Sequence, residues 1–121
     1  MTSLHHALFH AREHFAAYLI EKGCQINAKD KSQTTPLHVA VLKSSPQIAN
    51  ILIQNGADID AANIDGNTPL HLASKRRRAN MVKVLVDAGA NPLMFNLVHK
   101  TPAQMTDDEN IKDMLRKVSS Q

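Results

Sequence analysis

Histidine is the residue type that offers this chain the most chemistry, with seven copies in 121 residues. His6 and His10 are four residues apart on one predicted helix, and His14 stands at the start of the next. Two imidazoles at this spacing can bind zinc, but a zinc site needs a third or fourth ligand, and no motif fixes the nearby carboxylate of Glu13. We therefore expect neither a metal nor another cofactor, and calorimetric titration with zinc tests that expectation.

The other groups with catalytic potential are Cys24 and the acidic run Asp107-Asp108-Glu109. Cys24, the only cysteine, excludes an intrachain disulfide, and it stands where later parts of the chain have Ala57 and Ala90, which favours a small buried residue. Adjacent acids are typical of the first turn of a helix. The chain has no Gly-rich phosphate loop, no Gly-x-Ser-x-Gly elbow and no His-Glu-x-x-His motif. We therefore expect no enzyme activity and no catalytic residue.

Four consecutive cations, Lys75-Arg76-Arg77-Arg78, stand out against a net charge of only +3. Three interpretations stay open: a solvated loop end, a contact for an acidic partner, and a nuclear-import signal. Direct nucleic-acid binding is disfavoured, because none of the four aromatic residues neighbours the run and bases would find no stacking platform. A duplex-DNA affinity that falls steeply with salt would be needed to support such binding.

A repeat in the sequence positions all of these residues. TPLHVA at Thr35–Ala40 returns as TPLHLA at Thr68–Ala73, an interval of 33 residues, and the same step leads back to Thr2 and forward to Thr101. A period of this length indicates stacked supersecondary units that bury their apolar faces against one another. We expect a single domain over residues 1–121, with units at about 2–29, 30–62, 63–95 and 96–118.

Each unit carries the start and stop signals of two helices. Thr35 can cap a first helix, and Pro36 suits its first turn. Ser45-Pro46 repeats the start signal, and Gly56 suits a left-handed cap at the end of the second helix. Apolar residues between these signals supply the faces that stacking would bury.

With its 33-residue step and its T-P-L-H-x-A signature, the chain resembles the ankyrin repeat family over nearly its whole length. The resemblance implies an all-α repeat solenoid of stacked helix-turn-helix units joined by hairpin-like turns. It also implies a structural role for the signature histidines, which would form hydrogen bonds with neighbouring backbone. These histidines are His5, His38 and His71.

The family usually has glycine in the turn between the two helices, but this chain has Ala11, Ser44 and Arg77 there. A side chain in a left-handed conformation costs about 1 kcal/mol. We therefore expect glycine at positions 44 and 77 to raise the thermal midpoint.

Departures from the family pattern occur at both ends. There is no room for an opening turn before Thr2, and His6 replaces an apolar residue of the other units. In the last unit the apolar residues arrive about three positions early and are surrounded by charges; they are Ile111, Met114, Leu115 and Val118. These features predict capping units at both ends and a complete array.

Ankyrin proteins present a concave face made from turn tips and the exposed ends of first helices. Carried over position by position, this face predicts a partner segment with apolar anchors against Phe9 and Leu42, and acidic flanks facing Lys43, Lys75 and Arg76. The predicted partner-binding residues are Phe9, His10, Lys31, Ser32, Thr34, Leu42, Lys43, Ile64, Asp65, Asn67, Lys75, Arg76, Leu97, Val98 and Lys100.

The leading functional hypothesis is a non-catalytic protein-interaction module or scaffold, monomeric and intracellular, in the cytoplasm or nucleus. No stretch has the roughly 18 apolar residues of a membrane span, and the first 20 residues do not form a signal peptide. Two alternatives stay open. The chain is a nuclear regulator that uses Lys75-Arg78 for import or nucleic-acid contact, or it is the ankyrin segment of a larger enzyme or receptor.

Overall fold

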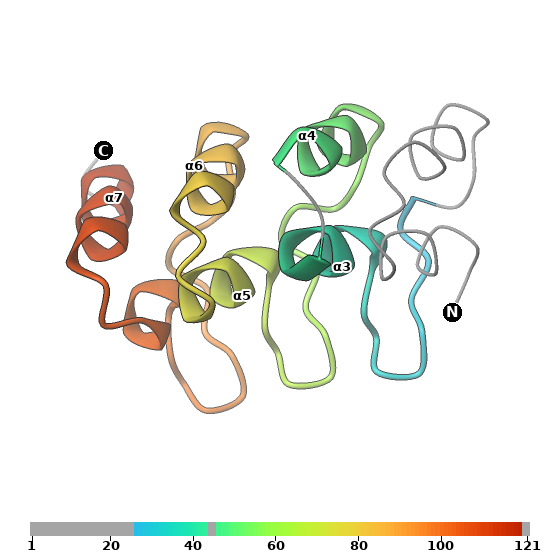
Figure 1. The fold of residues 1–121 in the computed structure, drawn as a ribbon. Coiled ribbons are helices and arrows are strands. Elements are labelled where there is room, and N and C mark those ends of the chain that lie inside the picture. Colours follow the sequence, from blue (N-terminus) through green and yellow to red (C-terminus); the bar gives the residue numbers. More distant parts are fainter. Residues whose placement is uncertain (1–25, 44–45, 120–121) are drawn as a thin grey trace.

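Helices make up the regular secondary structure of the computed structural model, which describes residues 26–43 and 46–119 (Figure 1). Within those residues no strand forms, and the expected all-α fold class is confirmed. The elements are α3 (Pro36–Lys43), α4 (Pro46–Gln54), α5 (Pro69–Lys75), α6 (Ala79–Asp87), the 3-10 helix η1 (Pro102–Met105) and α7 (Glu109–Ser119).

Several residues that carry sequence-based predictions lie outside the described residues. The predicted contacts Phe9 and His10, the thiol of Cys24 and the turn residues Ala11 and Ser44 belong to this group. So do the histidines His5, His6 and His14.

The described helices form two rows with loops on one side. Figure 1 shows α3, α5 and η1 in one row, which we call the inner row, and α4, α6 and α7 in a second, outer row, with the loops extending from the inner row away from the outer row. Within the rows, α3 packs on α5 and α5 on η1, while α4 packs on α6 and α6 on α7. We call residues 26–35 the first loop, residues 55–68 the second loop and residues 88–101 the third loop.

Threonine starts the inner helices as the sequence predicts. The Thr68 hydroxyl accepts the His71 N–H, and the His71 ring in turn accepts the Thr68 N–H, which satisfies two amides that the helix leaves unpaired. At the start of η1, the Gln104 side-chain oxygen likewise accepts the Thr101 N–H, and the Gln104 N–H donates to the Thr101 backbone carbonyl. These two caps fix where the chain turns from loop to helix.

The last inner element is a single 3-10 turn, although its start signal matches those of α3 and α5. Thr106 is extended, and its hydroxyl already accepts the Asp108 N–H. The Asp108 carboxylate then accepts the N–H groups of Asn110 and Ile111 at the start of α7. Because α7 begins early, no room remains for a second helical turn, and the predicted polar helix start at Asp107-Asp108-Glu109 is confirmed.

Glycine follows the ends of α4 and α6, as predicted. Gly56 and Gly89 both have φ +97°. Around Gly56, the Gly56 N–H donates to Ile53 O and the Ala57 N–H to Leu52 O, so the last carbonyls of α4 are satisfied within the turn. Arg77, in the turn between α5 and α6, has φ 56° and confirms the predicted left-handed conformation at that position.

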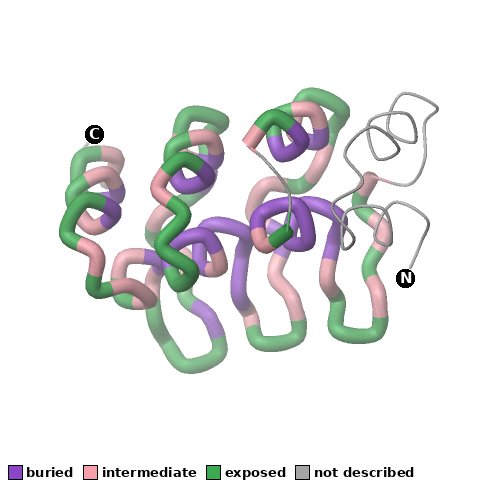
Figure 2. The backbone as a smooth tube through the Cα atoms, in the orientation of Figure 1, coloured by how far each residue is buried: buried purple, intermediate pink, exposed green. Residues whose placement is uncertain are grey.

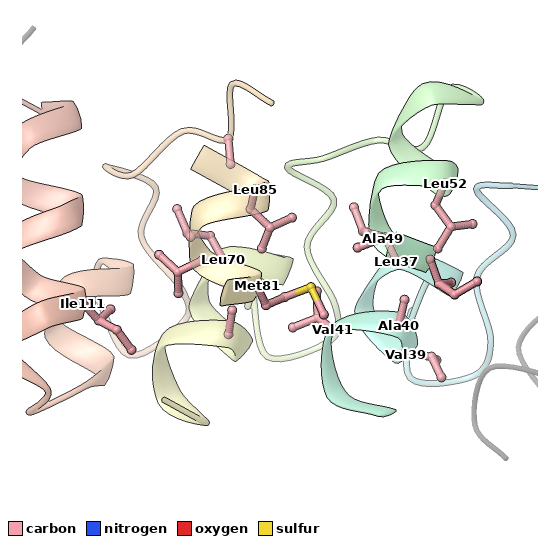
Figure 3. Packing of buried hydrophobic residues seen from close by; sticks show 14 of the residues in the cluster. Leu37, Val39, Ala40, Val41, Ala49, Leu52, Leu70, Met81, Leu85 and Ile111 are labelled. Atoms are coloured by element: carbon pink, nitrogen blue, oxygen red, sulfur yellow. The ribbon is translucent and has the colours of Figure 1, made fainter. Parts of the chain in front are cut away.

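The core lies between the two rows of helices (Figure 3). Leu37 and Leu70 in the inner row and Leu52 and Leu85 in the outer row are fully buried, and Ile111 of α7 closes the core next to α6. Each helix pair alone would leave this apolar face in water, so stacking supplies the burial. Figure 2 shows the result, with buried residues along the inner row and exposed residues at the loop tips.

Candidate functional site

The three loops share one internal hydrogen-bonding pattern. Asp30, Asn63 and Asn96 recur at the 33-residue step, and the side-chain oxygen of each accepts the N–H groups two and four residues later, at 2.9–3.1 Å. Gln33, Gly66 and His99 follow three residues later with φ between 59° and 76°. The loops therefore have nearly the same backbone despite different sequences.

Hydrogen bonds also join the tip of each loop to the next. The Ile64 N–H donates to Ser32 O at 2.9 Å, and the Leu97 N–H donates to Asp65 O at 3.0 Å. Nearer the inner helices, Asn96 Nδ2 donates to Asn67 Oδ1 at 2.9 Å. The three tips are consequently held as one surface rather than as independent loops.

Two buried histidines connect the inner helices to the following loop. His38 Nδ1 accepts the Thr35 N–H at 3.2 Å, and His38 Nε2 lies 2.9 Å from Asn67 O. His71 repeats both contacts, with the Thr68 N–H at 3.1 Å and Lys100 O at 2.8 Å. An amide donor on one nitrogen and a carbonyl acceptor on the other require the neutral ring with its proton on Nε2. The structural hydrogen bond expected for these histidines is confirmed.

This environment disfavours a charged imidazole. Burial lowers the pKa of both His38 and His71 below the ordinary value of 6.5, although the hydrogen bonds to Asn67 O and Lys100 O oppose the shift. A second proton on Nδ1 would also face the N–H donor of the capping threonine. Both rings therefore act as neutral structural groups.

A second set of ties runs through the loops at another position of the repeat. Asn27 Oδ1 accepts the Asp58 N–H at 2.7 Å, and the Asp60 carboxylate accepts the Asn91 N–H at 3.0 Å. At the next 33-residue step the chain has Leu93, which has no acceptor. Asn27 thus joins the first loop to the second, and Asp60 joins the second loop to the third.

Most of the predicted contact residues within the described part are exposed. Ile64, Leu97 and Val98 are large apolar side chains at the loop tips, with exposed fractions of 56%, 70% and 66%. Leu42 and Thr34 are half-buried. The polar and charged residues that are exposed are Lys31, Ser32, Lys43, Asp65, Lys75, Arg76 and Lys100.

Asn67 is the exception among these residues and has to be corrected. Its exposed fraction is 9%, and its side-chain oxygen accepts a hydrogen bond from Asn96. The side chain therefore aligns two loops instead of offering a surface to a partner. The sequence did not reveal this role because Thr34 and Lys100, at the equivalent positions, do not share it.

Sequence reasoning also missed two exposed apolar residues in the third loop. Phe95 is 65% exposed and Leu93 57% exposed. At the 33-residue step Phe95 matches Lys29 and Ala62. A large aromatic residue where other loops have lysine and alanine was the signal that could have identified it.

The basic run divides into two pairs with different surroundings. Arg77 forms an ion pair with Asp107, and Arg78 Nη2 donates to Leu42 O at 2.8 Å, at the last carbonyls of α3. Lys75 and Arg76 are exposed and form no ion pair with another described residue. A partner can therefore bind Lys75 and Arg76 without displacing a described contact, whereas Arg77 and Arg78 already bind groups within the fold.

Across 26–43 and 46–119, no three His, Cys, Asp or Glu side chains lie close enough together to hold a metal ion. No helix in these ranges has the length and apolar character to cross a membrane.

The chain matches a known protein family. A family model described as ankyrin repeats, in three copies, matches residues 1–63 and again residues 32–96. The matched residues cover more than half of the chain and include α3 to α6. No curated protein matches the chain significantly.

Proposed function

The chain belongs to the ankyrin repeat family, and on this premise we propose that it is a non-catalytic interaction module that binds a segment of another protein. Ankyrin repeats are generally protein-protein interaction modules and are typically non-catalytic. The binding surface in this proposal is the candidate face, formed by the loop tips and the C-terminal ends of the inner helices. Its described residues are Lys31, Ser32, Leu42, Lys43, Ile64, Asp65, Lys75, Arg76, Leu97, Val98 and Lys100.

The observation that carries the proposal is the row of exposed apolar tips. Ile64, Leu97 and Val98 would lose unfavourable contact with water by packing against a partner. Bonds between the tips hold them in place before binding, so little conformational entropy is lost when the partner docks. A rigid apolar strip is the kind of surface that supplies most of the affinity in protein interfaces.

Cations around the strip favour an acidic partner segment. Lys31, Lys75, Arg76 and Lys100 are exposed on the candidate face, and Asp65 is its only acid among the described residues. Such an excess of one charge speeds the encounter with a partner of opposite charge and discriminates against basic segments. The charge pattern and the apolar strip therefore describe one partner chemistry.

The placement of the basic run favours this proposal over nuclear import or nucleic-acid contact. Arg77 and Arg78 bind Asp107 and Leu42 O within the fold, and Lys75 belongs to α5. Importin-type recognition of all four cations would require the α5–α6 turn to open. We propose an intracellular monomer, in the cytoplasm or nucleus, and the same face would serve if the domain is the ankyrin segment of a larger protein.

The test compares a face variant with a matched variant elsewhere. Leu97→Asp with Arg76→Glu places two charges on the candidate face, at residues exposed enough to leave the core intact. Lys83→Glu with Asn80→Asp makes similar changes on the exposed surface of α6. A partner recovered by crosslinking should bind the face variant at least about tenfold more weakly, which is about 1.4 kcal/mol. A loss of less than twofold, or an equal loss in the α6 variant, would place the binding surface elsewhere.

A further inference from the structure

The exposed chemistry of the loops changes in order along the stack. The first loop exposes Lys29 and Lys31, while the one acid between them, Asp30, has its carboxylate engaged by two backbone N–H groups. The third loop has one exposed cation, Lys100, near its end, but residues 93–98 contain no charge and expose four large apolar side chains. These side chains are Leu93, Phe95, Leu97 and Val98.

The second loop is intermediate between these two. Its tip places the apolar Ile64 next to the acidic Asp65, and the helix that follows ends in the exposed cations Lys75 and Arg76. Cations thus dominate the surface from the first loop to the end of α5. Apolar groups dominate from Ile64 onward along the tips.

The scaffold does not require this gradient. All three loops have the same Asx contacts and the same left-handed residue, and both tip-to-tip hydrogen bonds use backbone atoms. The side chains at equivalent positions are nevertheless Lys29, Ala62 and Phe95. Since packing demands neither the charge nor the aromatic ring, and an exposed ring is unfavourable in water, the gradient fits the needs of a bound molecule.

We infer that the candidate face, extended by the exposed Lys29 of the first loop and Phe95 of the third loop, binds a bipartite protein segment, whose acidic residues lie over the first loop while large apolar side chains pack against the third loop. This inference rests on the proposed function and adds the order of the contacts. Lys29, Lys31 and Lys43 supply the positive charge at one end. Phe95, Leu97 and Val98 supply the apolar surface at the other end.

The spacing of the stack sets the length of this segment. Neighbouring packed helices lie about 8–10 Å apart, so two steps along the inner row span about 20 Å. An extended chain covers that distance in about six residues, and a helix in about thirteen. The two blocks are therefore separated along the partner and do not alternate residue by residue.

Selection from random peptides tests the order without knowledge of the natural partner. Sixteen-residue peptides displayed on phage are selected on the full chain, after depletion on the Leu97→Asp, Arg76→Glu variant. We expect enriched peptides to carry Asp or Glu at one end and Phe, Leu or Ile at the other. Enriched peptides with acidic and apolar residues intermixed, or without acids, would overturn the bipartite arrangement while leaving a binding face in place. If no peptide binds the full chain better than it binds the variant used for depletion, the proposed function fails together with this inference.

Double-mutant cycles then assign each block to its loop. For the best peptide, two changes should be coupled: replacing its acids with alanine, and Lys31→Glu in the protein. Once one change is made, adding the other should weaken binding by less than twofold. The same peptide change and Val98→Asp should combine multiplicatively, because they disturb opposite ends. Coupling to Val98 instead of Lys31, or equal coupling to both, would overturn the inference. Lys83→Glu on α6 is the control, and circular dichroism checks that each variant remains folded.

Discussion

The two junctions between described helix pairs differ from the outward face of the last pair, η1 and α7. At the junctions, His38 and His71 reach the carbonyl of the following loop, and Asn27 and Asp60 accept N–H groups from it. In the last pair the 33-residue step places Gln104 and Leu93 at these positions. Gln104 accepts the N–H of its own Thr101, and Leu93 is an exposed apolar residue.

This difference separates two roles within one repeated pattern. At a junction, the repeated polar residues satisfy backbone groups of the neighbour, so their identity is set by the scaffold. In the last described pair, the residues at these positions form no such bond to a following loop, and one of them, Leu93, belongs to the apolar third loop. Repetition of a residue type therefore identifies ties between units, whereas a break in the repetition identifies surface open to other uses.

Removing a junction histidine should have the largest effect. His71→Ala leaves the Thr68 N–H and Lys100 O without a partner and creates a cavity at a fully buried position, so we expect a loss of about 3 kcal/mol in unfolding free energy. Gln104→Ala, at the exposed equivalent position, should lose less than about 1 kcal/mol. Urea unfolding followed by circular dichroism measures both.

The comparison would be broken if both variants lost the same free energy. His38→Ala provides a replicate at the other junction, where the contacts are nearly identical. A small loss for both histidine variants would mean that these ties position the loops without stabilising the stack.

The close approach of the second and third loops predicts the next largest effect. A Cβ at Gly66 would lie 2.8 Å from the backbone nitrogen of Leu97, whereas a Cβ at Gly56 would meet nothing within 4 Å. Both residues have positive φ, so alanine is strained at either position. We expect Gly66→Ala to lower the unfolding free energy by about 2 kcal/mol and Gly56→Ala by about 1 kcal/mol. Equal losses would show that the loops can separate without a penalty.

The junction histidines also make stability depend on pH. Burial lowers the pKa of His38 and His71 in the folded state, so the unfolded chain binds protons more readily, and stability present above pH 6.5 is lost as the pH falls. The slope reaches at most about 1.4 kcal/mol per pH unit for each ring, and we expect the unfolding free energy to fall steadily between pH 7 and pH 5. His71→Gln should reduce that slope. An unfolding free energy that stays constant over this range would contradict the account.

The smallest effect is expected at the α5–α6 turn, where Arg77 is left-handed and pairs with Asp107 across a junction. Arg77→Gly removes backbone strain worth about 1 kcal/mol and an exposed ion pair worth less, so the thermal midpoint should rise by a few degrees. Arg77→Ala loses the ion pair and keeps the strain, and its midpoint should fall slightly. A lower midpoint for the glycine variant would show that the ion pair stabilises this junction more than the strain destabilises it.

Features that depend on the repeated backbone could be predicted from the sequence. The period gave the helix starts at Thr35 and Thr68, the left-handed Gly56 and the hydrogen-bonding role of His38 and His71, because each of these residues acts within its own unit or on the next one in a fixed way. The exposed tips Ile64, Leu97 and Val98 also follow from their place in the loops.

Features that depend on one particular pair of neighbours could not be predicted. Asn67 is buried because Asn96 faces it, and its side-chain oxygen accepts a hydrogen bond from the Asn96 amide. Asp30, at the equivalent position of the first loop, has no such amide donor. The basic run divides because Asp107 and the end of α3 lie beside Arg77 and Arg78. The 33-residue period predicts features that all units share, but it carries no information on a contact that occurs only once.

The histidine ties also set how unfolding spreads through the chain. Each tie joins residues 29 apart in sequence, across the boundary between one helix pair and the next. In a linear stack, the coupling at such boundaries decides whether the units melt together or one at a time. Without the His71 tie, η1 and α7 would open before the pairs behind them, and the third loop, with its apolar residues, would lose its fixed position first. The buried His71 imidazole therefore couples the last helix pair to the pair before it, and the apolar end of the face stays assembled only while these pairs remain folded together.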